Sequence, residues 1–84
     1  MAQDRALLEL LLARRGVATT VELTSGVLLD VNSIVFGYDE GADQAHVTTN
    51  INPFIEGESV EVFMTGEIVA VRDAGSGTVL YKSN

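Results

Sequence analysis

The chain has 84 residues, no cysteine, 12 acidic and 5 basic side chains, and a formal net charge of −7. This length fits one domain, the lack of cysteine excludes disulfides and thiolate metal sites, and the acidic balance disfavours broad contact with phosphate backbones. Apolar residues make up 46% of the sequence, more than so small a core is expected to bury. We therefore expect a single domain over residues 1–84 that places part of its apolar surface in a subunit interface.

The N-terminal segment, residues 4–15, is predicted to form a helix. Asp4 is a suitable N-cap, the leucines that follow recur at the spacing of one helix face, and Gly16 is a suitable stop. Arg14 and Arg15 are expected in the last turn, where positive charge offsets the helix dipole.

No stretch of the sequence approaches the ~20 apolar residues that cross a bilayer as a helix. The leucine-rich N-terminal run is short, carries Glu9 in its middle and lacks a sequence that resembles a cleavage site. The sequence therefore predicts a soluble, cytoplasmic protein without a membrane partner.

After Gly16 the apolar period changes from the helical value to two, which predicts a half-buried strand over residues 17–24. A turn that contains Gly26 leads into a longer segment, residues 27–38, with apolar residues at both parities. A strand that changes its buried face midway is what a strongly bent barrel strand needs. We expect this segment to bend.

Four further strands are predicted, over residues 44–51, 58–65, 67–72 and 78–82. Proline cannot continue a strand ladder, so Pro53 is expected to end the first of these. The following Phe54-Ile55 pair is expected to plug one end of the fold.

The short connections suit antiparallel neighbours, and no crossover helix is present for parallel ones. The predicted fold is mainly β: a small, strongly bent five-stranded antiparallel barrel over residues 17–72, with the N-terminal helix across one end. The segment 78–82 adds an extra C-terminal strand.

Two segments carry a resemblance to a known family. Residues 21–29 form an alternating strand, a turn that ends in Gly26 and a second strand, and Tyr38-Asp39 follows near the next loop. Residues 63–69 form an apolar pair, Thr65-Gly66, an acidic residue and alternating apolar residues. In this pattern the chain resembles the Sm-like (Lsm/Hfq) family over about residues 4–72.

The resemblance implies a barrel that assembles into a homo-oligomeric ring and binds single-stranded RNA. Under this reading the pore-side site is lined by Tyr38, Asp39, Asp43 and Thr65-Gly66. Arg14 and Arg15 would meet phosphates on the helix face.

Three positions depart from the family pattern. Val31 or a neighbour stands where the family has a glycine midway along the second strand. Thr65 stands where the family has a basic residue, and Asp43 stands where it has an asparagine. These departures and the net charge leave a second function open: a structural or protein-interaction ring that has lost nucleic-acid binding.

The resemblance also implies an interface in which the strand before Gly66 pairs with the strand after it in the next subunit. Both segments are apolar on two faces, so unpaired edges here would be an aggregation hazard. The predicted interface residues are Val60, Val62, Phe63, Met64, Ile68, Val69 and Val71.

Other chemistry is weakly indicated. Asp39, Glu40, Asp43 and His46 could together hold a divalent cation, but acidic loops are usually only solvated, and we predict neither a metal nor a cofactor. No pairing of a nucleophile with a base is visible, so we expect no enzyme activity.

Overall fold

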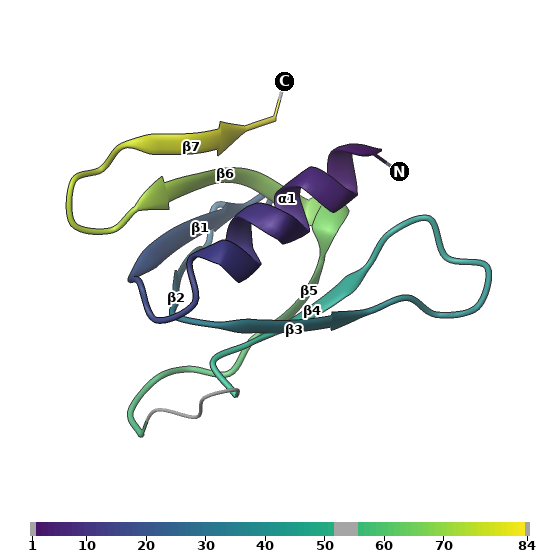
Figure 1. Cartoon of the computed structure of the whole chain (residues 1–84), viewed down its shortest axis with the longest axis horizontal. Helices are drawn as coiled ribbons and strands as arrows, with labels where there is room; N and C mark the ends of the chain where they lie inside the picture. The colour runs from purple at the N-terminus through teal and green to yellow at the C-terminus, as the bar shows by residue number, and fades with distance from the viewer. Residues whose placement is uncertain (1, 52–55, 84) are drawn as a thin grey trace.

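The computed structural model describes residues 2–51 and 56–83, and the side chains of residues 5–51 and 56–83. Within these ranges one helix, α1 (Ala2–Ala13), precedes seven strands and a single 3₁₀ turn, η1 (Thr65–Glu67). The predicted mainly-β class with an N-terminal helix is confirmed (Figure 1). The expected plug, Phe54-Ile55, and the stop at Pro53 lie outside the described residues.

The strands form two antiparallel sheets. The four-stranded sheet has the order β2 (Leu28–Val31), β1 (Thr19–Leu23), β6 (Ile68–Asp73), β7 (Val79–Lys82). The three-stranded sheet has the order β3 (Ile34–Gly37), β4 (His46–Thr49), β5 (Val62–Met64). Among the described residues no hydrogen-bonded barrel closes, so the barrel remains a proposal.

The helix begins earlier and ends earlier than predicted. Asp4 is the third residue of α1 and does not precede it, so the expectation of an Asp4 N-cap is wrong. Arg14 and Arg15 follow the helix in a turn that donates backbone N–H groups to Leu11 and Leu12. Gly16 comes next with a φ of +83°, a conformation that favours glycine after a helix.

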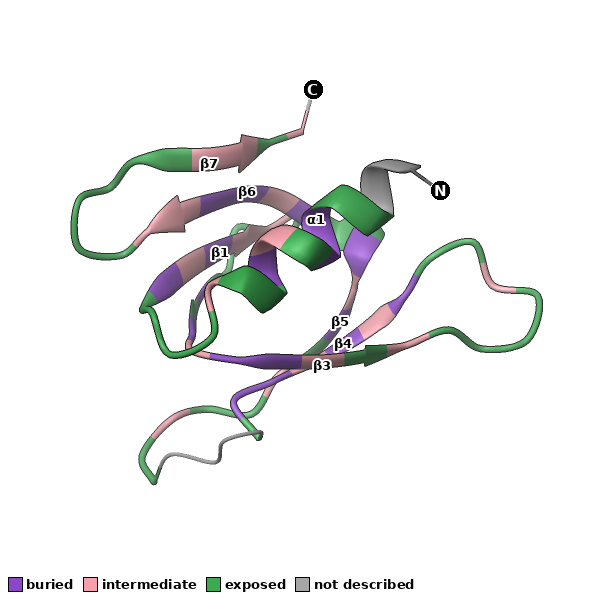
Figure 2. Ribbon diagram, in the orientation of Figure 1, coloured by how far each residue is buried: buried purple, intermediate pink, exposed green. Residues whose placement is uncertain are grey.

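The core joins the helix to both sheets. Leu7, Leu8 and Leu11 of α1 belong to one buried cluster with residues of both sheets, among them Val21 of β1 and Val47 of β4. Figure 2 shows buried residues along α1, β1 and β6, whereas β7 is exposed or half-buried along its length. In the described ranges no helix is long and apolar enough to cross a membrane.

The predicted bend in residues 27–38 is confirmed, and it transfers the chain from one sheet to the other. The strand is interrupted at Asn32-Ser33, so that β2 belongs to the first sheet and β3 to the second. Asn50 lies against this bend and is completely buried. Ser33 is also buried, and its Oγ has no hydrogen-bond partner among the described residues.

Asn50 uses its whole side-chain amide to hold the bend. Its Oδ1 accepts the backbone N–H of Asn32 at 2.8 Å. Its Nδ2 donates to the carbonyl oxygens of Asp30 and Ser59 at 2.9 and 2.7 Å. Its backbone N–H donates to the Ser33 carbonyl at 2.9 Å, and its φ of +61° is the only positive value among the described non-glycine residues.

The predicted strands 58–65 and 67–72 follow each other across the Thr65-Gly66 step but do not pair with each other as a hairpin. β5 and β6 belong to different sheets and are joined by η1, so the Thr65-Gly66 step is a passage between sheets. The expectation that both strands are edges holds only for β5. The outer side of β6 is covered by β7, the C-terminal strand whose existence the sequence did predict.

Replacing Asn50 tests how much this side chain contributes to stability. Asn50→Ala removes three hydrogen bonds and leaves an alanine at a positive φ that alanine disfavours. We therefore expect the free energy of unfolding to fall by about 4 kcal/mol. Asn50→Gly loses the same bonds but accepts the backbone conformation, so it should be about 1 kcal/mol less destabilised. Urea unfolding at one fixed protein concentration measures both; equal losses would contradict the backbone argument.

Candidate functional site

Three of the predicted site residues lie together in the connection between β3 and β4. Tyr38, Asp39 and Asp43 are all exposed there. The Tyr38 ring meets the Phe36 ring edge to face, with centroids 6.5 Å apart and an interplanar angle of 90°. Phe36 is 42% and Tyr38 47% exposed, so this pair presents aromatic surface to solvent.

The base of this connection is held by its own polar contacts. His46 begins β4, and its Nε2 lies 3.6 Å from Oδ1 of Asp39, with both side chains substantially exposed. In residues 5–51 and 56–83, no three His, Cys, Asp or Glu side chains gather closely enough to hold a metal. The geometry therefore gives the cation hypothesis for this loop no support.

Thr65 and Gly66 lie at the foot of the same connection, but their polar groups serve the fold. Thr65 is 3% exposed, and its Oγ1 accepts the backbone N–H of Ala45 at 3.3 Å. The Gly66 N–H donates to Oε1 of Gln44 at 3.0 Å. A Cβ at Gly66 would lie 2.4 Å from that oxygen, so the position accepts only glycine without a shift of Gln44.

Arg14 is not available to a phosphate. Its Nε donates to Oγ1 of Thr19 at 2.7 Å, and its Nη2 donates to Oδ1 of Asp73 at 2.5 Å. The Arg14 side chain is 17% exposed. It therefore fastens the end of α1 to the end of β6, on the side of the molecule away from the β3–β4 connection (Figure 1).

Asp73 is the centre of this fastening. Its carboxylate accepts the backbone N–H of Ser76, the Arg14 guanidinium and the Ser76 hydroxyl. In that order of importance, these bonds lower the pKa of Asp73 from 3.8 to about 2. The same contacts shape the turn between β6 and β7.

Four basic side chains remain, and two of them face carboxylates of the same chain. Arg72 Nη2 lies 3.0 Å from Oε1 of Glu22, and Arg5 Nε lies 3.9 Å from Oε1 of Glu9 on the exposed face of α1. With Arg14, three of the five basic side chains are paired in this way. Arg15 is exposed but also has a partner within the chain.

The structure divides the predicted interface residues into two groups. Phe63, Ile68 and Val71 are at most 4% exposed and belong to the chain's own core. Val62 and Val60 are 69% and 45% exposed, and Met64 and Val69 are half-buried. The apolar surface offered to a partner is therefore concentrated on β5 and the residues before it.

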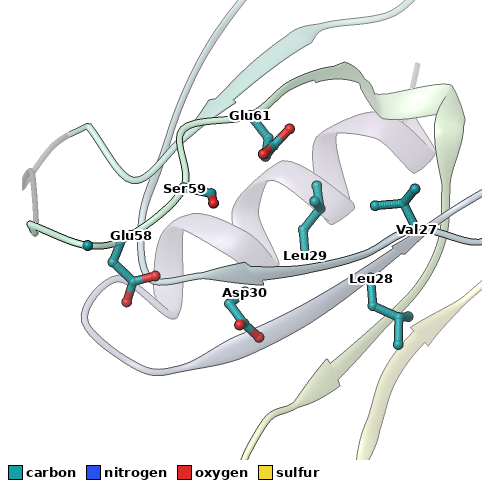
Figure 3. Close-up of a pocket in the computed structure, with 8 residues that line it drawn as sticks. Val27, Leu28, Leu29, Asp30, Glu58, Ser59 and Glu61 are labelled. Atoms are coloured by element: carbon teal, nitrogen blue, oxygen red, sulfur yellow. The ribbon is translucent and has the colours of Figure 1, made fainter.

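A cleft of about 340 Å³ lies between the start of β2 and the segment that leads into β5 (Figure 3). Val27, Leu28 and Leu29 line one side, and Leu28 is 61% exposed. The carboxylate-bearing residues on its walls are Asp30, Glu58 and Glu61. The cleft suits a group with an apolar stem and a positive end rather than an anion.

No family model, curated protein or solved structure matches this chain. The function therefore has to be argued from the site itself. Sequence reasoning missed the residues that organise it, namely Gln44, Asn50, Glu67 and Asp73. Their partners are distant in sequence or are backbone groups of turns, and neither leaves a pattern in the sequence.

The hydrogen bonds that Asp73 accepts, first from the Ser76 backbone N–H and then from Arg14, predict a pH dependence of stability. Because the pKa of Asp73 is depressed in the folded state, its contribution is fully present above 3.8 and is lost as the pH falls toward about 2. Asp73→Asn should flatten the dependence of the urea midpoint on pH in that window. Asp43→Asn, in the exposed loop, is the control and should follow the unmodified protein; an unchanged slope in Asp73→Asn would contradict the assignment.

Proposed function

We propose that the chain is a Sm-like β-protein whose function is self-assembly into a ring that serves protein interaction. The sheets support this fold when they are followed through the bend at Asn32-Ser33. The strands then form one run, β6, β1, β2–β3, β4, β5. Since η1 joins the two ends of this run by three residues, the run has to curl back on itself as a barrel does.

The single observation that carries the function is the apolar edge at β5. β5 pairs only with β4, and Val62 on it is the most exposed of the large apolar side chains in the described part of the chain. An edge strand with exposed apolar residues and neither lysine nor proline is a template for pairing with another strand. A partner that completes this sheet would cover Val60 and Val62 together.

The electrostatics favour a protein partner over RNA. The basic side chain expected to meet phosphate, Arg14, is occupied by Asp73 and Thr19. The Thr65 hydroxyl is hydrogen-bonded to the backbone of Ala45, and the Gly66 N–H is hydrogen-bonded to the side chain of Gln44. With a net charge of −7, the field of the whole molecule repels a polyanion.

Val62→Lys tests the assembly. Lysine on an edge strand opposes pairing because a neighbour would have to desolvate its charge, so we expect the dissociation constant of the assembly to rise at least ~10-fold. Light scattering across a concentration series measures this, and far-ultraviolet circular dichroism checks the fold. Val17→Lys, at an exposed residue before β1, is the matched control; a monomeric unmodified protein at every concentration would refute the proposal.

Single-stranded RNA is the second candidate, favoured by one observation. The exposed Phe36–Tyr38 pair offers ring surface on which a base could stack, and such contacts are worth ~1–3 kcal/mol each. This aromatic surface lies beside the carboxylate of Asp39. No arginine or lysine contact is described there, so the phosphates of a bound RNA would have no positive partner.

Titration with labelled oligo-uridine and oligo-adenosine separates the two functions. We expect no binding below micromolar concentration even at low salt, where screening is least. Affinity that appears at low salt, weakens as salt rises and falls in Tyr38→Ala would establish the RNA-binding function instead. Val35→Ala, in the same strand but half-buried, controls for a general loss of structure.

A further inference from the structure

The C-terminal strand changes which edges of the molecule are open. β7 pairs antiparallel with β6 in the register Val71↔Tyr81, and the Ser83 N–H donates to the Val69 carbonyl at 2.7 Å. Leu80 and Tyr81 also pack against the core. The outer side of β6 is therefore occupied by the chain itself, and the two ends of the described strand run are β5 and β7 (Figure 1).

The open side of β5 can be read from its pairing with β4. Thr65 donates its N–H to the Ala45 carbonyl at 2.9 Å, and Phe63 is opposite Val47 in the register. Backbone groups of alternate residues point in opposite directions within an antiparallel pair. The backbone groups of Val62 and Met64 therefore point away from β4.

One of these outward groups is already used. The Met64 N–H donates to Oε2 of Glu67 in the following turn, at 2.8 Å. The outward donor that β5 keeps for a partner is the N–H of Val62, whose side chain is also 69% exposed.

The open side of β7 follows from the same alternation. Ser83 and Tyr81 direct their backbone groups at β6, so Lys82 between them directs its groups outward. The register shifts beyond Tyr81, where Val79 is opposite Arg72. Val79 is 52% exposed, and Lys82 is exposed. This edge offers a partner the outward backbone groups of Lys82, on a strand that also carries the exposed apolar side chain of Val79.

The two open edges differ in charge. Residues 56–67, which contain β5, carry four glutamates and no basic residue. Residues 74–83, which contain β7, carry one lysine and no acidic residue. Pairing β5 with a second β5 would bring the glutamates together, whereas pairing β5 with β7 sets Lys82 against them.

We propose that copies of this chain associate head to tail, with the edge of β7 in one copy pairing with the edge of β5 in the next. This inference rests on the proposed self-assembly and names the two strands that perform it. It differs from the interface expected from the resemblance, because β7 takes the place of β6. A heterologous contact of this kind repeats from copy to copy and closes into a ring if the rotation allows.

Antiparallel pairing, which every described strand pair uses, also gives the contact a direction. The outward backbone groups of Lys82 in one copy then meet those of Val62 in the next, which brings Lys82 beside Glu61 and Val79 toward the Met64 end of β5. Glu58, Glu61 and the exposed Leu28 all line the cleft of Figure 3. The lysine stem and its ammonium group have the apolar and positive character that this cleft suits.

The absence of cysteine allows a direct test by cross-linking. Val62→Cys reports on β5 and Val79→Cys on β7, both at exposed positions. The two variants, one of them labelled with heavy nitrogen, are unfolded in urea, refolded together and treated with a short bismaleimide. Ser25→Cys, in the exposed turn before β2, is the control partner for each variant, and Val60→Cys is a second probe of the β5 side.

We expect cross-linked dimers that contain one labelled and one unlabelled chain, at least ~5-fold above the yield of either variant alone or with the Ser25→Cys control. Mass spectrometry counts the labelled chains. Light scattering on the same samples reports assembly independently. Assembly with cross-links only between like variants, or with none, overturns the β5–β7 contact but leaves the proposed function standing; a monomer at every concentration overturns both.

Discussion

The fold depends on one buried amide at the point where the chain passes from one sheet to the other. Asn50 is completely buried and joins three backbone segments that are otherwise separate: the end of β2, the bend at Asn32-Ser33 and the stretch at Ser59. A bend leaves backbone donors and acceptors without ladder partners, and burying them unpaired would cost several kcal/mol in total. Asn50 satisfies these groups and accepts a positive φ to do so. The relative placement of the two sheets, and of the core between them, follows from this contact.

Polar side chains at the surface are also hydrogen-bonded within the chain. The polar side chains that a binding site would use are instead bonded within the chain: Arg14 to Asp73, Arg72 to Glu22, and Gln44 to the backbone of Gly66. What remains for a partner is apolar strand edge and an acidic cleft. Such a surface recognises another polypeptide through its backbone and aliphatic side chains more readily than it recognises a nucleic acid.

Periodicity predicted the helix, the mainly-β class and the bend, because burial of one helix face or one strand face leaves a regular trace in the sequence. It could not predict that Arg14 pairs with Asp73, since 59 residues separate them and no pattern links the two. Nor could it predict that Phe63, Ile68 and Val71 face the core while Val62 faces solvent. In a segment apolar at every position, alternation carries no information, and only the position of η1 decides which parity is buried. Tyr38, Asp39 and Asp43 of the β3–β4 connection were named from the sequence, but the groups that hold that connection were not.

β5 is only three residues long, and Glu67 already takes one of its outward donors. A single interface made from so short a strand pair is weak, because its few hydrogen bonds offset little of the translational and rotational entropy that two molecules lose on association. A subunit at the end of an open oligomer is held by one interface and would dissociate readily. In a closed ring every subunit is held by two interfaces. For the proposed ring, the short edge therefore implies cooperative assembly: partly built forms would be sparse, and the complete ring would form abruptly above a threshold concentration.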